Sequence, residues 1–245
     1  MKPKIVAIVT ARMNSKRMYG KPMKLVRGKP IIEWCIQRLQ SCKKIDQVVI
    51  ATSTKHENTA FISLANQLGI GYYAGDEEDV LDRFVQCAKK FGATHIVRAT
   101  SENPLMYVEE LDELIEDHLQ KHADFTYTDK LPLGCFIEII SFTALQRSHD
   151  EGEKKHHSEL VTLYINEHKD QFKINQHTAP SHLQRPDYRL TVDTEDDLKL
   201  MNIIYERIKD DFIQLKDVIT LLDNEPDLLK INSAVPIGES RIWKP

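Results

Sequence analysis

A basic loop follows the first apolar segment of the sequence. Residues 12–21 include four Lys or Arg side chains, a serine and a glycine. Cations this close repel one another unless an anion neutralises them, and a triphosphate supplies about four negative charges. The loop is therefore a candidate phosphate-binding site, with a solvated basic loop as the alternative. The cations are Arg12, Lys16, Arg17 and Lys21, and the other two residues are Ser15 and Gly20.

Two acidic residues, Glu102 and Asp193, stand just after segments that have the pattern of strands. Mg²⁺ prefers oxygen ligands and keeps several waters, so one or two carboxylates plus phosphate oxygens are enough to hold it. The two side chains can converge if their segments end at the same edge of a sheet. Taken alone, each could instead be a turn or helix-capping acid.

Other candidate motifs are weaker. Residues 69–74 formally match the dinucleotide pattern G-x-G-x-x-A, but they follow an expected helix and lead into an expected strand, which reverses the required context. His149, His156 and His157 lie in a charged segment without the fixed spacing of metal ligands. We therefore expect a solvated surface at these histidines.

The residues that could do chemistry follow short β-branched runs that alternate with helical patterns. This alternation favours an α/β fold with a mostly parallel sheet and crossover helices. Open sheets of this kind bind ligands at the carboxyl ends of their strands, which is where the basic loop stands. Strands are expected at 4–10, 47–52, 72–74, 94–100 and 124–128, and helices at 30–40, 58–68, 80–91 and 108–122.

The pattern changes from about residue 131, where an elaboration of the same core is expected over 131–185. It contains expected strands at 137–140 and 172–176 and expected helices at 143–147 and 159–167. Beyond it we expect a buried strand at 189–192, a helix at 195–209 capped by Thr194, and a helix at 215–222. No repeat or low-complexity segment divides the chain, so residues 1–245 are expected to form one domain.

Composition excludes several classes of protein. The 245 residues are 41% hydrophobic and 29% charged, as in ordinary globular proteins, and the net charge of −4 argues against general nucleic-acid binding. The apolar stretch 5–9 is far shorter than the roughly 18 residues that a membrane span needs, and it lacks a signal-peptide cleavage pattern. We expect a reduced, cytoplasmic protein without a membrane segment. Its cysteines, expected to be small buried apolar residues, are Cys35, Cys42, Cys87 and Cys135.

Six motifs occur in a fixed order between about residues 4 and 205. They lie at 8–22 with Gly-Lys-Pro at 28–30, at 49–53, at 75–84 (G-x-x-x-D-V-L-D-R-F), at 98–105, at 134–138 and at 189–198. Together they resemble the CMP-Kdo/acylneuraminate cytidylyltransferases. Within that group the sequence is most similar to the spore-coat polysaccharide biosynthesis (SpsF-like) branch.

The resemblance implies a Rossmann-like, mostly parallel sheet flanked by helices, of the nucleotide-diphospho-sugar transferase type. The region 131–185 would be an inserted dimerisation and acceptor region, and the protein a homodimer. The implied activity depends on CTP and Mg²⁺: an acceptor oxygen attacks the α-phosphate, pyrophosphate leaves and a CMP-linked product forms. The implied acceptor is an acidic sugar of the Kdo or sialic type, or a related small anion, used for surface polysaccharide or glycoconjugate synthesis.

The resemblance also implies roles for the basic loop. Arg12, Arg17 and Lys21 would be the catalytic cations, because negative charge accumulates on the phosphate oxygens and the leaving group during transfer. They would contact the β- and γ-phosphates, while Lys16 either joins them or points outward. The residues implied to bind the nucleotide are Ala11, Arg12, Ser15, Lys21, Ala51, Thr52, Ser53, Asp79 and Arg83, with Ala51–Ser53 near the cytosine ring.

Alternatives stay open for several of these residues. Asp79 and Arg83 could form an i,i+4 pair on a helix surface, worth a few tenths of a kcal/mol. Glu102 and Asp193 are the implied magnesium ligands. The residues implied to meet the acceptor are Glu138, Arg185 and Arg189, although each arginine could instead form a structural salt bridge.

Two positions depart from the family pattern. Glu102 stands where the family usually has aspartate, and Leu160 stands where it usually has histidine. Two other functions therefore remain. A metal-dependent glycosyltransferase could use Asp193-Thr194-Glu195 as its acidic metal motif, and a non-catalytic homologue would bind the nucleotide without turnover.

Overall fold

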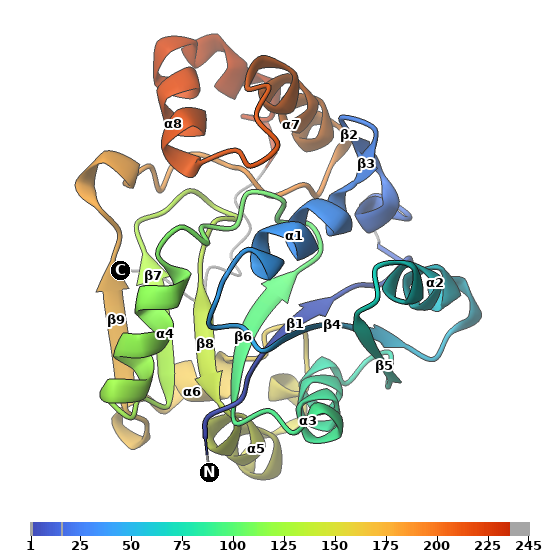
Figure 1. The fold of residues 1–245 in the computed structure, drawn as a ribbon, viewed down its shortest axis with the longest axis vertical. Coiled ribbons are helices and arrows are strands. Elements are labelled where there is room, and N and C mark those ends of the chain that lie inside the picture. The colour runs from blue at the N-terminus through green and yellow to red at the C-terminus, as the bar shows by residue number, and fades with distance from the viewer. Residues whose placement is uncertain (1, 16, 236–245) are drawn as a thin grey trace.

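A seven-stranded sheet forms the centre of the protein in a computed structural model that describes residues 2–15 and 17–235 (Figure 1). The strand order is β5-β4-β1-β6-β8-β7-β9. All neighbouring strands run parallel except β8, which is antiparallel to both β6 and β7. The strands are β1 (Ile5–Thr10), β4 (Gln47–Ser53), β5 (Gly71–Gly75), β6 (His95–Thr100), β7 (Phe125–Asp129), β8 (Glu138–Ser141) and β9 (Ile174–Thr178), and a separate hairpin pairs β2 (Leu25–Val26) with β3 (Lys29–Pro30).

Helices cover both faces of the sheet, as the alternating sequence pattern predicts. Figure 1 shows α1 and α4 in front of the sheet, while α3 and α5 pack together on the other side. The α-helices are α1 (Ile31–Gln40), α2 (Thr59–Gln67), α3 (Val80–Phe91), α4 (Leu111–Gln120), α5 (Phe142–Glu151), α6 (Leu163–Glu167), α7 (Glu195–Arg207) and α8 (Leu215–Asn224). The 3-10 helices are η1 (Lys21–Met23), η2 (His56–Asn58), η3 (Lys154–His156), η4 (Lys169–Gln171), η5 (Ser181–Leu183) and η6 (Pro226–Ile231).

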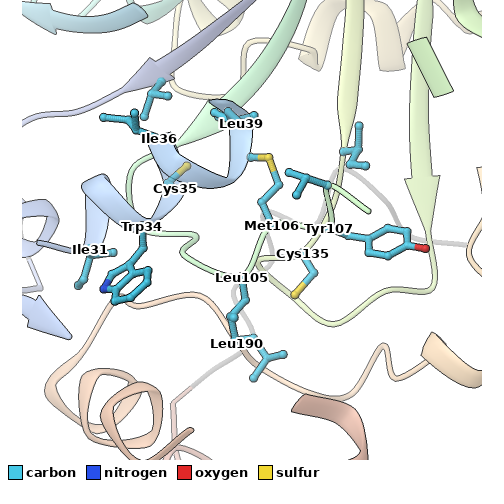
Figure 2. Packing of buried hydrophobic residues seen from close by; sticks show 14 of the residues in the cluster. Ile31, Trp34, Cys35, Ile36, Leu39, Leu105, Met106, Tyr107, Cys135 and Leu190 are labelled. Carbon is cyan, nitrogen blue, oxygen red and sulfur yellow. The ribbon is translucent and has the colours of Figure 1, made fainter. Parts of the chain in front are cut away.

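The alternation of side chains along β1 explains how one sheet serves two cores. Ile5, Ala7 and Val9 belong to the cluster that contains α1, α2, α4, α7 and α8, whereas Val6 and Ile8 belong to the cluster with α3, α5 and α6. Figure 2 shows part of the first cluster, in which side chains of α1 gather with those of the segment after β6 and with Leu190. Since β1 is apolar on both faces, it is a central strand.

The order of the strands creates a crevice between β1 and β6. The chain leaves β1, pairs β4 beside it, adds β5 outside β4, and then returns to place β6 on the other side of β1. The connections after β1 and β6 therefore leave the sheet in different directions. Ligands bind at such switch points in α/β sheets, so this topology directs attention to the residues just after β1 and β6.

Most expected elements are confirmed within two or three residues at each end, and the helix at 80–91 is confirmed at both ends. Two expectations are wrong. Residues 189–192 are buried but form no strand, because only one bridge joins Arg189 to Leu133. The expected helix at 159–167 is helical only in α6, since residues 159 and 160 turn toward a cavity instead.

The four cysteines are confirmed as buried residues without a disulfide. Burial raises the pKa of Cys35, Cys42 and Cys87 to about 12, so these thiols stay protonated. Within the described ranges, the helices are all too short or too polar to cross a lipid bilayer.

Candidate active site

A cavity of about 480 Å³ lies at the carboxyl ends of β1 and β6. Among the described residues that line it, six carry a positive charge and four a negative charge, which is a formal excess of two positive charges. Such a cavity favours a polyanion. The cations are Arg12, Arg17, Lys21, Arg83, Arg98 and Arg189, and the acids are Glu102, Glu138, Glu159 and Asp193.

The basic loop is held in shape by backbone contacts. The N–H of Met13 donates to Asn58 Oδ1 at 2.8 Å, and the N–H of Gly20 donates to the Met13 carbonyl at 2.8 Å. Gly20 has a φ of 65°, which glycine adopts without steric cost, and η1 begins directly after it with Lys21. The loop therefore turns back and places Lys21 in the cavity. The predicted loop residues that line the cavity are Ala11, Arg12, Ser15, Arg17 and Lys21, whereas Lys16 lies outside the described residues.

Lys21 connects the two predicted metal ligands. Its Nζ lies 2.6 Å from Asp193 Oδ1 and 3.4 Å from Glu102 Oε1, and only 10% of its side chain is exposed. Burial alone would lower the pKa of this ammonium, but the negative charges of Glu102 and Asp193 together outweigh burial and raise the pKa. Lys21 is thus a fixed positive charge at neutral pH.

Asp193 is surrounded by cations. Arg17 Nη2 lies 2.9 Å from its Oδ1, and Arg189 Nη2 donates to its Oδ2 at 2.9 Å. Burial on its own would raise the pKa of Asp193, but Lys21, Arg17 and Arg189 hold that pKa below its ordinary value. The carboxylate therefore stays ionised.

The start of α7 fixes Asp193. The carboxylate of Asp197 accepts from the backbone N–H groups of Asp193 and Thr194, each at 3.0 Å, and the Thr194 hydroxyl accepts from the N–H of Asp197. This capping box confirms Thr194 as the predicted cap. Arg189 also donates to Asp197, at 2.8 Å, so it joins both acids and orients Asp193.

The backbone brings Glu102 to the same place. The carbonyl of Glu102 accepts from the N–H of Val192 at 3.0 Å, so the segment after β6 is bonded directly to the segment that carries Asp193. Two carboxylates thus converge on one ammonium in a cavity that is rich in cations. This donor set fits Mg²⁺, which takes one or two carboxylates and completes its shell with waters and phosphate oxygens.

A second chain of charges lines the cavity. Arg98, in the middle of β6, pairs with Glu138 on β8, and the Thr162 hydroxyl donates to Glu138 at 3.2 Å. Arg98 also donates to the carbonyl of Glu159, and the Glu159 carboxylate lies 2.9 Å from Arg12 Nη2. Glu138 therefore lines the cavity, and contact with an acceptor stays a prediction. No individual role was predicted from the sequence for Arg98 or Glu159.

Several predicted residues are not among those that line the cavity. Ala51, Thr52 and Ser53 are buried at the end of β4. Asp79 caps α3 by accepting from the N–H of Asp82, while Arg185 pairs with Asp223 at 2.5 Å. The salt-bridge alternative therefore describes Arg185.

Arg83 lines the cavity but does not form the alternative surface pair with Asp79. Its guanidinium donates to the carbonyls of Asp76 and Glu77 at 2.6–2.9 Å, and only 1% of the residue is exposed. Burial lowers the pKa of Arg83, and the nearby Arg12 adds to that effect. Arg83 therefore stiffens the loop before α3 and adds positive charge to the cavity.

Comparison with known proteins identifies the family and the fold of the chain. Residues 6–225 match the family described as cytidylyltransferase. The sequence is 35% identical to an uncharacterised protein of Methanocaldococcus jannaschii, covering 95% of this chain and 96% of that protein. It is 31% identical to the spore coat polysaccharide biosynthesis protein SpsF of Bacillus subtilis, covering 91% and 95%. The structure of a cytidylyltransferase from Leptospira borgpetersenii matches the fold with a TM-score of 0.85 at 23% identity, over 97% of this chain and 99% of that one.

Proposed function

This chain belongs to the cytidylyltransferase family of CTP-dependent nucleotidyltransferases, and from that premise we propose that it transfers CMP from CTP to a small anionic acceptor and releases pyrophosphate. One observation carries the proposal: Lys21 stands between Glu102 and Asp193, and Arg17 and Arg189 complete the ring of charges around Asp193. Phosphoryl transfer requires mainly positioned charge, which this arrangement supplies.

In the proposed reaction a hydroxyl oxygen of the acceptor gives up its proton to solvent and forms a bond to the α-phosphorus of CTP. The bond from that phosphorus to the oxygen that bridges to the β-phosphate breaks, and pyrophosphate leaves with the bonding electrons. Arg12, Arg17 and Lys21 neutralise the charge that builds up on the pyrophosphate. Because Lys21 is already held by two carboxylates, little reorganisation is needed as charge develops.

Mg²⁺ is part of the proposal. Asp193 and Glu102 are the residues that would hold it, and bound Mg²⁺ would supply Lewis-acid stabilisation of phosphate charge. The Glu102 side chain is one methylene longer than the aspartate that is usual at this position. Its Oε1 lies 3.4 Å from Lys21 Nζ, which is 0.8 Å farther than the 2.6 Å between Asp193 Oδ1 and the same nitrogen. Arg189 acts through Asp193 as a positioning residue.

The acceptor is proposed to be an acidic sugar of the Kdo or sialic type, or a related anion. Arg98 and Glu138 offer it a cation and a hydrogen-bond acceptor on the wall formed by β6 and β8. Similarity to SpsF, a protein named for spore coat polysaccharide biosynthesis, supports a role in surface polysaccharide or glycoconjugate synthesis. Leu160 lines the same cavity and makes that part of it apolar.

The geometry does not favour the glycosyltransferase alternative. Its acidic metal motif would need Glu195 beside Asp193, but 72% of the Glu195 side chain is exposed and its carboxylate lies 3.8 Å from Lys24. Thr194, between them, is committed to capping α7. The three residues of that motif therefore do not converge on one point.

The experiment is a screen of anionic acceptors for CTP-dependent pyrophosphate release in the presence of Mg²⁺. Lys21→Met should lose on the order of 10²-fold or more in rate with the acceptor that works. Lys24→Met is the matched control, because Lys24 is three residues farther along and makes only an exposed contact with Glu195. Equal rates for both variants, or no pyrophosphate with any acidic sugar, would count against the proposal.

A further inference from the structure

Two of the histidines expected on a solvated surface come together beside α3. His157, just after η3, places its Nδ1 2.5 Å from Asp79 Oδ2, and the rings of His149 and His157 have their centres 4.7 Å apart. Ligand atoms of Asp79, His149 and His157 all lie within 4.8 Å of one another. The expectation of a solvated surface at the three histidines is wrong, since only 24% of the side chains of His149 and His157 is exposed, and only 3% of that of His156.

The cluster joins segments far apart in sequence. His149 Nε2 lies 4.0 Å from Asp79 Oδ2 and 3.5 Å from the Oδ1 of Asp82, one turn into α3. Its other ring nitrogen, Nδ1, lies 3.3 Å from Asp150 Oδ1. When Nδ1 donates to Asp150, the lone pair of Nε2 faces the two aspartates of α3. A carboxylate that orients the far nitrogen is the usual partner of a metal-binding histidine.

A tight turn presents His157 to this place. Gly152 ends α5, and a Cβ there would lie 2.3 Å from the carbonyl oxygen of Ser148, so only glycine fits. His156, of which only 2% is exposed, accepts from the N–H of Glu153 at 2.7 Å and meets Glu167 at 2.9 Å. These contacts fix the turn, and the direction of the next residue, before any ligand binds.

We propose that Asp79, His149 and His157 form a binding site for one divalent transition-metal ion of the Zn²⁺ type, with Asp82 as the fourth ligand. Two imidazole nitrogens and a carboxylate favour Zn²⁺ over Mg²⁺, which prefers oxygen ligands. Ligand atoms about 2.0–2.2 Å from a zinc ion stand roughly 3.4 Å apart in a tetrahedron. Measured to Asp79 Oδ2, the Nε2 of His149 at 4.0 Å must therefore approach by about 0.6 Å, and the Nδ1 of His157 at 2.5 Å must move away by about 0.9 Å. For Nδ1 of His157 to bind the ion, the proton on that nitrogen must move to Nε2 by exchange with solvent, so that the ring stays neutral.

The site is separate from the cavity that contains Lys21, since neither histidine nor Asp79 lines that cavity. It is nevertheless close along the chain to residues that do. Asp79 precedes Val80, and His157 precedes Glu159 and Leu160, all three of which line the cavity. A bound ion would therefore tie the segment 157–160 to the start of α3 and hold one wall of the active site.

The test uses full-length, untagged protein stripped of metal by a chelator and kept in excess Mg²⁺ to occupy magnesium sites. Co²⁺ absorption in the visible range reports four-coordinate binding, and competition with a chromophoric chelator gives the Zn²⁺ affinity. We expect equimolar binding that is lost in His149→Ala and separately in His157→Ala. Asp150→Asn should weaken Zn²⁺ binding by roughly 10- to 100-fold, because it removes only the orienting partner.

Two controls make the outcome decisive. His182→Ala removes an exposed histidine elsewhere, and Asp193→Asn alters the proposed magnesium site; both should bind zinc as the wild type does. Zinc-free melting curves of the histidine variants should show cooperative unfolding, so that lost binding is not lost folding. The absence of a four-coordinate Co²⁺ band, its persistence in both histidine variants, or its loss in Asp193→Asn would overturn the proposal.

Discussion

Replacing Asp193 with asparagine keeps the shape of the side chain and removes its charge. Three cations then face a neutral amide: Lys21 at 2.6 Å, and Arg17 and Arg189 at 2.9 Å. Hydrogen bonds to charged groups contribute about 1.5–3 kcal/mol each, against about 0.5–1.5 kcal/mol for neutral ones. Arg17 is 56% exposed, so the two buried contacts dominate. The free energy of unfolding should fall by about 2–3 kcal/mol.

The effect of Asp193→Asn on catalysis should be larger than its effect on folding. The substitution removes one of the two carboxylates proposed to hold Mg²⁺ and lets Lys21 move away from its position beside the phosphates. Loss of one positioned electrostatic group commonly costs on the order of 10²–10³-fold in rate, and the magnesium concentration needed for half-maximal rate should rise.

The assay is pyrophosphate release under saturating CTP and acceptor, with Mg²⁺ titrated, at a temperature where the variant is folded. Asp196→Asn is the matched control, because Asp196 is exposed at the start of α7 and does not line the cavity. Its rate and magnesium dependence should match those of the wild type. A wild-type rate and an unchanged magnesium titration for Asp193→Asn would refute the assignment of Asp193 as the centre of the site.

Three further predictions rest on other parts of the chain. Glu102→Gln should lower the rate, and raise the magnesium concentration needed for half-maximal rate, nearly as much as Asp193→Asn does. Glu102→Asp need not restore the rate, because Glu102 is 25% exposed and its surroundings fit the longer side chain. Wild-type kinetics in Glu102→Gln would remove Glu102 from the site. Burial, with a smaller contribution from His95, lowers the pKa of His118 from its ordinary 6.5 to about 4. Between pH 6.5 and pH 4, His118 therefore binds a proton in the unfolded chain but not in the folded chain. The free energy of unfolding should therefore fall as the pH drops from 6.5 towards 4, by at most about 1.4 kcal/mol per pH unit, and denaturant titrations of His118→Gln should show a flatter dependence. We also predict a homodimer formed through the region 131–185, so light scattering at micromolar concentration should give twice the chain mass of 28.3 kDa, and a monomer would contradict this.

The sequence predicted the core of the site because the signals there are local. Strand β1 is recognisable from its continuous apolar run, and the basic loop follows it directly. Glu102 follows a recognisable strand, so the rule that ligands bind at the carboxyl ends of strands applies to it. Asp193 was assigned through the family resemblance, since residues 189–192 form no strand. Lys21 between the two carboxylates could not be foreseen, because the turn at Gly20 decides where the loop places its last cation.

Other residues could not be predicted because their partners lie far away in sequence. Arg98 gave one usable signal, a charged residue between the apolar residues Val97 and Ala99 of a strand, whereas Glu159 gave none. The segment 189–192 has the composition of a strand, but its backbone bonds go to residues 102 and 133 rather than along a sheet edge. His149 and His157 meet Asp79 only because α5 packs against α3, a tertiary contact that spacing along the chain does not reveal.

The most direct test of the account follows both products of one reaction. CTP labelled at the α-phosphorus is mixed with Mg²⁺, protein and an acidic sugar that supports turnover, and the quenched reaction is analysed by chromatography and mass spectrometry. We expect every molecule of pyrophosphate to be matched by one molecule in which CMP is joined to the acceptor, and Lys21→Met to slow the formation of both products by the same factor. Release of free CMP without a joined product, or tight CTP binding with no turnover across the anionic acceptors, would contradict it.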